Sequence, residues 1–127
     1  MYDTEILTDL LYKIQDCLTK IQIRLKSVNT VADLTDSPAG MERLDLLCMP
    51  LIVIGELVKK IDKITDKSFF KKYPDIPWGE IKGMRNIVVH DYFNIDAEEI
   101  FNTCKEDIPI VTETINAIII DLEKQAE

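Results

Sequence analysis

Residues 6–28, with the sequence ILTDLLYKIQDCLTKIQIRLKSV, decide the fold class. The apolar residues of this stretch recur every three or four positions and charged residues fall between them, which is the pattern of an amphipathic α-helix. At about 1.5 Å per residue, this helix spans about 36 Å, the length of a small helical bundle. The rest of the chain shows no sustained strand alternation bounded by turn residues. The sequence therefore predicts an all-α protein.

A second apolar period runs from Leu44 to Ile64 and contains Pro50, so we expect a kink near residues 46–50. Three further helices are predicted over residues 78–92, 97–105 (ending before Pro109) and 109–125. Breaks separate the helices at residues 33–40, 66–77 and 94–96. We expect a single domain over 1–127, built as a bundle of about five helices with two long antiparallel helices and shorter ones.

Charge and cysteine content exclude several classes of protein. The chain has 15 Lys and Arg against 23 Asp and Glu, and its net charge of −8 argues against indiscriminate coating of nucleic acid. Cys17, Cys48 and Cys104 are odd in number and lack CxxC spacing, so we expect buried free thiols rather than disulfides or a zinc cluster. Neither a signal peptide nor a membrane-length apolar run is apparent, which predicts a cytoplasmic protein.

Charge is unevenly distributed along the chain. The window from Lys59 to Arg85 holds eight basic and four acidic residues, which gives +4 against −12 for the remainder. One interpretation is a solvated helix face followed by a polar loop. The other is a local surface that attracts phosphate on an otherwise acidic protein.

The basic window ends in residues 83–93, GMRNIVVHDYF, which gather groups with chemical uses. His90 is the chain's one histidine and is suited to proton transfer at neutral pH. Arg85 can bind two phosphate oxygens at once, and Tyr92 offers a hydroxyl. On a helix Asn86 and His90 share a face, whereas Arg85 and His90 are offset by about 140°. The two can converge through fraying near His90, through the length of the arginine, or across a two-fold interface.

Each of these residues also has an ordinary structural interpretation. A lone histidine on a helix is more often structural than catalytic. Arg85 can form a salt bridge with Glu80 or Asp91, and Tyr92 can be a core residue with its hydroxyl at the surface. Glu56, inside an apolar helix, needs a partner, for which Arg85 or a backbone amide is a candidate.

The spacing Arg85-x4-His90-x-Tyr92 resembles the Arg-x4-His-x-Tyr signature of HEPN-domain proteins, specifically the HepT toxin family. Three further blocks resemble this family in the same order: Ile54-Gly55-Glu56, Tyr73-Pro74-Asp75-Ile76-Pro77-Trp78 and Asp107-Ile108-Pro109. A lone Arg-x4-His is a weak signal, but the ordered set is specific.

The resemblance implies a HEPN helical bundle that forms a homodimer and acts as a metal-independent endoribonuclease without a cofactor. The cleft would lie at the dimer interface and be lined by both copies of the motif. His90 would act as general base or acid, Arg85 would stabilise charge on the phosphate, and Asn86 would orient the phosphate or the histidine. Candidate contacts to RNA phosphates are Lys71, Lys72 and Lys82.

The resemblance also implies regulation. The protein would be the toxin of a type VII toxin–antitoxin pair, neutralised when a partner minimal nucleotidyltransferase transfers AMP to Tyr92. Two alternatives belong to other classes: a non-catalytic docking partner that accepts nucleotide from this transferase, and a helical dimerisation protein without a site. The co-occurrence of Arg85, Asn86 and His90 with Tyr92 favours the ribonuclease, because docking alone does not need the arginine and the histidine.

Overall fold

The structure, a computed structural model, describes residues 2–126, and no β-strand occurs within that range. The α-helices are α1 (Thr4–Leu25), α2 (Ala32–Thr35), α3 (Pro38–Ile64), α4 (Trp78–His90), α5 (Ala97–Asn102) and α6 (Ile108–Ala126). Two 3-10 turns, η1 (Phe70–Lys72) and η2 (Tyr92–Asn94), and one π-helical turn, η3 (Thr103–Asp107), complete the elements. The all-α expectation is confirmed.

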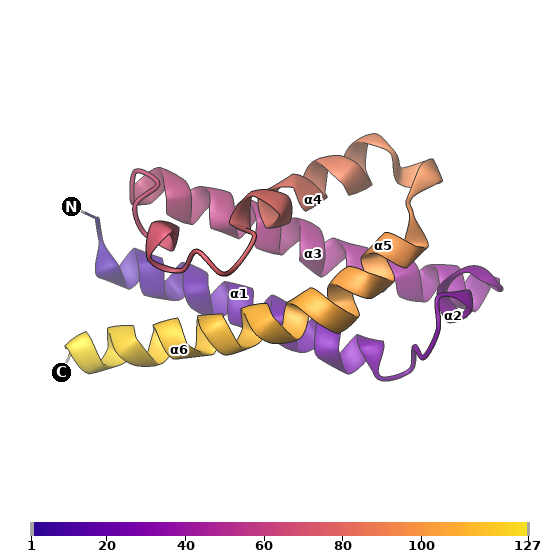
Figure 1. Cartoon of the computed structure of the whole chain (residues 1–127), viewed down its shortest axis with the longest axis horizontal. Coiled ribbons are helices and arrows are strands. Elements are labelled where there is room, and N and C mark those ends of the chain that lie inside the picture. The colour runs from indigo at the N-terminus through magenta and orange to yellow at the C-terminus, as the bar shows by residue number, and fades with distance from the viewer. Residues whose placement is uncertain (1, 127) are drawn as a thin grey trace.

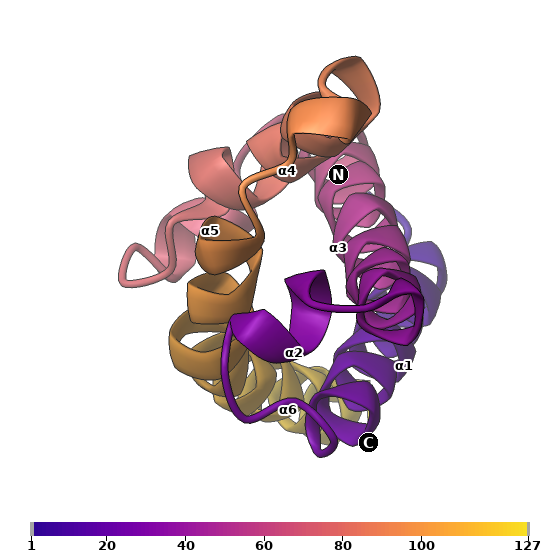
Figure 2. The same ribbon diagram turned by 90° about the vertical axis from the view of Figure 1, so that its right-hand side faces the viewer.

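The long helices lie side by side along the molecule, as Figure 1 shows, with α4 extending along α3. Helix α1 packs on both α3 and α6, and α3 packs on α4. The view along the bundle in Figure 2 shows α2 lying across one end. Figure 1 places both chain termini at the opposite end. Within residues 2–126 no helix combines the length and the apolar character that a membrane span requires.

The apolar stripe predicted for the first helix forms the centre of the core. The stripe is buried from Leu10 onward, whereas Ile6 at its start is 52% exposed. Fully buried side chains of α1 meet equally buried side chains of α3 and α6: Leu7, Leu11, Ile14, Leu18, Ile21, Leu47, Ile61, Ile115 and Ile118. The three cysteines are buried and free, as expected. Burial raises the pKa of Cys48 to about 11 and that of Cys104 to about 12, which keeps both thiols protonated at neutral pH.

Capping side chains fix where three helices begin. Asp3 Oδ1 accepts hydrogen bonds from the backbone of the first turn of α1, and Ser37 Oγ accepts one from Gly40 N at 3.0 Å at the start of α3. Asp96 caps α5 by accepting from the Glu98 and Glu99 amides at 3.0 and 3.2 Å. Each cap satisfies amide groups that the helix itself leaves without partners.

Helix α3 continues through Pro50 without a break. A proline has no N–H, so the carbonyl of Leu46, four residues earlier, loses its usual helical partner. Arg24 of α1 replaces it, because its Nη1 donates to Leu46 O at 2.7 Å. The α1–α3 contact thus satisfies the carbonyl that Pro50 leaves free.

The two C-terminal helices, predicted separately over residues 97–105 and 109–125, are joined by a further helical turn. Helix α5 ends at Asn102, and the chain passes through η3 directly into α6 at Ile108. Within this turn the Ile108 amide donates to Thr103 O, five residues back. The wider turn immediately precedes Pro109. Proline has no N–H, so in an ordinary α-helix the carbonyl four residues earlier would lack its partner.

Candidate functional site on helix α4

Helix α4 carries Arg85, Asn86 and His90 of the motif, and an aromatic cluster fixes the segment that leads into it. The Trp78 ring stacks on Phe70 with centroids 4.0 Å apart, and its Nε1 donates to Tyr73 O at 2.8 Å. Phe69 packs edge-on against Phe70. These contacts anchor the loop between α3 and α4 and set the position at which α4 begins.

Helix α4 lies antiparallel to α3 at close range. A Cβ atom added to Gly55 would lie 2.9 Å from Ile81 O, so the glycine permits the approach of the two backbones. Met84 and Val88 of α4 are buried in the core. Polar pairs cross the seam between the two helices in antiparallel order: Asp62–Lys82, Glu56–Arg85 and Asp45–Tyr92.

Arg85 was one of the partners considered for the Glu56 carboxylate, and the structure shows this pair. Within residues 2–126 the arginine forms no ion pair with Glu80 or Asp91, the partners considered for the arginine itself. Arg85 Nε lies 3.1 Å from Glu56 Oε1, and the side chains are 42% and 41% exposed. Glu56 Oε1 is itself buried and accepts no aligned hydrogen bond within the described residues, so the contact is an ion pair rather than a directional bond. The guanidinium is held against α3 and still reaches solvent.

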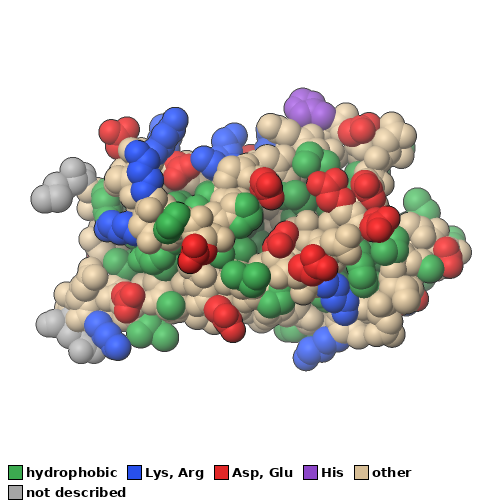
Figure 3. All heavy atoms as spheres, viewed as in Figure 1, with side chains coloured by type: hydrophobic (Ala, Val, Ile, Leu, Met, Phe, Trp, Pro, Cys, Tyr) green, Lys and Arg blue, Asp and Glu red, His purple; other side chains and the backbone are tan. Residues whose placement is uncertain are grey.

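Asn86 and His90 share the exposed face of α4, one turn apart, as the helical spacing predicts. Neither side chain has a hydrogen-bond partner in the part of the chain that the structure describes. The histidine projects from the upper edge of the surface in Figure 3. Because His90 is the last residue of α4, it combines a defined position with free access to solvent.

Tyr92 lies in η2, directly after α4, and is held by α3. Its hydroxyl donates to Asp45 Oδ1 at 2.7 Å, which raises the pKa of the phenol above its ordinary value. The Asp91 carboxylate accepts a hydrogen bond from Asn94 Nδ2 at 3.0 Å within the same turn. The tyrosine as a whole is half exposed.

A groove between the end of α3 and α4 begins at Asn86 and has a volume of about 550 Å³. Lys82 lines it and donates to Asp62 Oδ2 at 2.6 Å. Three lysines from the C-terminal end of α3 and the turn after it complete its basic lining: Lys59, Lys63 and Lys67. Sequence reasoning counted these lysines in the basic window but did not assign them to the site. Their spacing of four residues is the signal that could have done so.

The other two lysines predicted to contact phosphate lie elsewhere. Lys71 and Lys72 are on η1 and do not line the groove. Lys72 Nζ instead lies over the Phe69 ring, 5.8 Å from its centroid. In Figure 3 the basic side chains gather toward the upper left, and acidic side chains cross the middle of the face.

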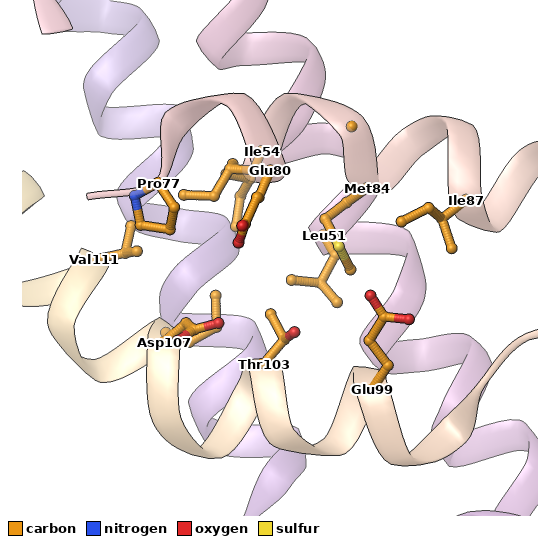
Figure 4. Close-up of a pocket in the computed structure, with 13 residues that line it drawn as sticks. Leu51, Ile54, Pro77, Glu80, Met84, Ile87, Glu99, Thr103, Asp107 and Val111 are labelled. Carbon is orange, nitrogen blue, oxygen red and sulfur yellow. The ribbon is translucent and has the colours of Figure 1, made fainter. Parts of the chain in front are cut away.

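A second cavity, of about 370 Å³, opens on the side of α4 that faces α5 and α6 (Figure 4). Its floor is apolar and its rim carries the carboxylates of Glu80, Glu99 and Asp107. None of Arg85, Asn86 and His90 lines this cavity, so it is separate from the motif face. Residues 2–126 contain no group of three or more His, Cys, Asp or Glu side chains placed to hold a metal ion.

Comparisons with known proteins agree on one family. The family model described as "Ribonuclease HepT-like" matches residues 14–118. "Putative RNase MJ0125" of Methanocaldococcus jannaschii is 43% identical over 75 residues, which cover 59% of this chain and 61% of that protein. "Putative RNase MJ1380" of the same organism is 29% identical over 96 residues, covering 74% of this chain and 88% of that protein.

"Probable ribonuclease HepT" of Thermococcus cleftensis is 41% identical over 59 residues, covering 46% of this chain and 50% of that protein. The match to "Putative RNase MJ0125" spans 61% of that protein's length, and the match to "Putative RNase MJ1216", also of M. jannaschii, spans 60%. The comparison with solved structures found no significant match.

Proposed function

Because the chain belongs to the HepT-like ribonuclease family, we propose that it is an endoribonuclease whose active face is the exposed side of α4. One observation carries the proposal. Helix α4 presents Asn86 and His90 side by side to solvent, and Arg85 lies half exposed next to them against Glu56. A proton-transfer group and an amide thus share one face of α4, and a permanent cation lies at the edge of that face; RNA cleavage uses all three kinds of group.

The proposed chemistry is transfer of the phosphate to the neighbouring ribose hydroxyl. The 2′-oxygen forms a bond to phosphorus, and the bond from phosphorus to the 5′-oxygen breaks, which leaves a 2′,3′-cyclic phosphate and a 5′-hydroxyl. His90 takes the proton from the 2′-hydroxyl as a base while water protonates the leaving 5′-oxygen, or it protonates the 5′-oxygen as an acid while water takes the proton from the 2′-hydroxyl. The Arg85 guanidinium stabilises the charge that builds on the phosphate oxygens. These groups accomplish the reaction without a metal ion.

We propose further that a second copy of the chain completes the cleft. On one helix Arg85 and His90 are offset by about 140°, so they do not point at the same phosphate. Two apolar side chains beside the motif are open to solvent: Val89 is 50% and Phe93 is 96% exposed. A symmetric pairing over this end of α4 would cover both and bring the two motifs together.

The same surface supports control by nucleotide transfer to Tyr92 from a minimal nucleotidyltransferase antitoxin. The phenol is half exposed and follows His90 by two residues. An AMP group on its oxygen would place a bulky anion next to Arg85 and His90, where it would fill the cleft and repel RNA phosphate. The unmodified chain would then be the toxic form.

Cleavage of a labelled RNA by the purified chain in the presence of EDTA tests the enzyme proposal. We expect the wild type to give 2′,3′-cyclic phosphate ends and His90→Ala to be inactive with an unchanged melting temperature, because the imidazole is exposed. Asn102→Ala, an exposed asparagine outside the motif, is the matched control and should retain activity. Cleavage by His90→Ala at the wild-type rate would overturn the assignment.

Growth of a bacterial culture on induction of the chain tests the toxin proposal. We expect the wild type to arrest growth and the double variant Arg85→Ala/His90→Ala to be harmless at equal protein level. Equal toxicity of the two would remove Arg85 and His90 as the catalytic pair. A nucleotide-docking role without catalysis predicts labelling of Tyr92 from ATP by the partner and no RNA cleavage in the first assay.

A further inference from the structure

The groove that begins at Asn86 extends the motif face along the last turns of α3. We call it the lysine groove and define it by Lys59, Lys63, Lys67, Lys82 and Asn86. Asn86 lies one helical turn from His90 on the same exposed face. A chain-like ligand in the groove would therefore run directly onto the proposed catalytic surface.

The lysines of the groove differ in whether an acidic side chain pairs with them. Lys82 is neutralised by Asp62, with Nζ and Oδ2 2.6 Å apart. Lys59, Lys63 and Lys67 are exposed, and none of them forms an ion pair within residues 2–126. Asp66 also lines the groove, so its four lysines and two aspartates sum to +2, a local exception on a chain that carries −8 as a whole. Such an arrangement favours direct contact with phosphates over attraction at long range.

The three free lysines form a row. Lys59 and Lys63 are one helical turn apart on α3, about 6 Å along the axis. Helix α3 ends at Ile64, and the backbone then turns through positive φ at Asp66 and Lys67, with φ of 52° and 62°. The row of lysines ends at this turn. The groove is the narrow seam between α3 and α4. A single strand can follow such a seam with its backbone, whereas duplex RNA presents two strands across a wide, shallow groove.

We propose that the lysine groove binds the sugar–phosphate backbone of single-stranded RNA next to the scissile phosphate. Lys59, Lys63 and Lys67 each contact a phosphate, and Asn86 lies where the strand passes onto the face of His90. This inference rests on the proposed ribonuclease function, because it assumes that RNA is the polyanion that reaches α4. It assigns the binding role to side chains that carry no part of the cleavage chemistry.

Binding of a fluorescent single-stranded RNA that carries 2′-O-methyl groups tests the groove, because this probe cannot be cleaved. The variant is Lys59→Gln/Lys63→Gln, and the matched control is Lys26→Gln/Lys124→Gln, which removes the same charge from exposed lysines away from the groove. We expect the groove pair to lose roughly tenfold in affinity and the control pair less than about twofold. The slope of log K against log salt should fall by about 1.4 for the two lost phosphate contacts.

Several outcomes would overturn the groove: no binding of the probe by the wild type, equal losses for the two variants, or an unchanged slope for the groove pair. Equal or tighter binding of a duplex of the same length would overturn the single-strand assignment. The binding assay needs no cleavage, so failure of the two proposals can be told apart. A chain that binds through the lysines and cuts nothing retains the groove and loses the ribonuclease. A chain that cuts RNA, and binds the probe equally well when Lys59 and Lys63 are replaced, retains the ribonuclease and loses the groove.

Discussion

Arg85 and Glu56 are close together, yet both are about two-fifths exposed, at 42% and 41%. Water screens an ion pair of this kind, so it contributes at most about 1 kcal/mol to folding. Its effect is on geometry, since it fixes one side of a long and flexible arginine against α3. We therefore regard Glu56 as a positioning residue for the cation of the proposed site.

Replacing Glu56 by Gln tests this role. The amide keeps the size of the side chain and removes its charge, so Arg85 is released from α3 while the packing stays. We expect kcat for RNA cleavage to fall by about tenfold, a loss of about 1.4 kcal/mol in transition-state stabilisation. The free energy of unfolding should change by less than about 1 kcal/mol. A stability loss with an unchanged kcat would assign the pair to folding instead.

The hydrogen bond from Tyr92 to Asp45 predicts a pH effect. It raises the pKa of Tyr92 above 10.0, so the phenol stays protonated to higher pH in the folded chain than in the unfolded one. The resulting stability is fully present below the unfolded pKa and is lost as pH rises through the folded pKa. In Asp45→Asn we expect the Tyr92 pKa to fall toward its ordinary value. The difference in phenolate absorbance between each protein and its Tyr92→Phe counterpart measures this pKa.

Sequence reasoning reached the residues within α4 and missed most of their partners. The shared face of Asn86 and His90 follows from helix geometry alone. Asp45 and Tyr92 are 47 positions apart, and their contact depends on the antiparallel docking of α3 on α4, which no local pattern specifies. The Glu56–Arg85 pair was among the alternatives, because a carboxylate inside an apolar helix requires a partner.

At the scale of elements, the packing of α3 on α4 depends on Gly55. In Gly55→Ala the new Cβ would lie 2.9 Å from Ile81 O, a backbone atom, so the helices must separate. We expect a loss of about 1 kcal/mol or more in the free energy of unfolding. Gly83→Ala is the matched control, because its Cβ meets nothing within 4 Å, and it should gain up to about 1 kcal/mol from helix propensity. Urea unfolding measures both, and equal shifts would contradict the close-approach argument.

The contact between Arg24 and the Leu46 carbonyl predicts a coupling to Pro50. In Arg24→Met the carbonyl loses its donor, and we expect a cost of about 1 kcal/mol. In a Pro50→Ala background the new amide can bond to Leu46 O, so the same change should cost almost nothing. A double-mutant cycle from urea unfolding measures the difference. An equal cost in both backgrounds would show that Arg24 acts elsewhere.

The elements that periodicity predicted are the long ones. The first helix and the run from Leu44 to Ile64 appear as α1 and α3, because each buries a stripe that repeats over many turns. Helix α2 has four residues, which is too short for a helical period to be recognised in the sequence. The gap between the predicted helices 97–105 and 109–125 is the π-helical turn η3, because one wider turn accommodates the missing amide of Pro109 and keeps the chain helical.

At the scale of the whole molecule, the proposed site raises the question of whether one chain or two supply its groups. Arg85 and His90 diverge on one α4, and Val89 and Phe93 leave an apolar surface beside them. A two-fold pairing at this surface would set Arg85 of one copy against His90 of the other. The active unit would then be a dimer, and each of its two sites would take one group from each chain.

Mixing two inactive variants distinguishes this arrangement from a site within one chain. Arg85→Ala and His90→Ala are each expected to be inactive alone. If each site takes one group from each copy, a mixed dimer contains one intact site and one that lacks both groups. Random pairing at equal amounts makes half the dimers mixed, so about a quarter of wild-type activity should return after joint refolding. If both groups act from one chain, every site in the mixture lacks one of them and no activity returns. Restoration that disappears when Phe93→Asp blocks pairing would locate the shared interface at the end of α4.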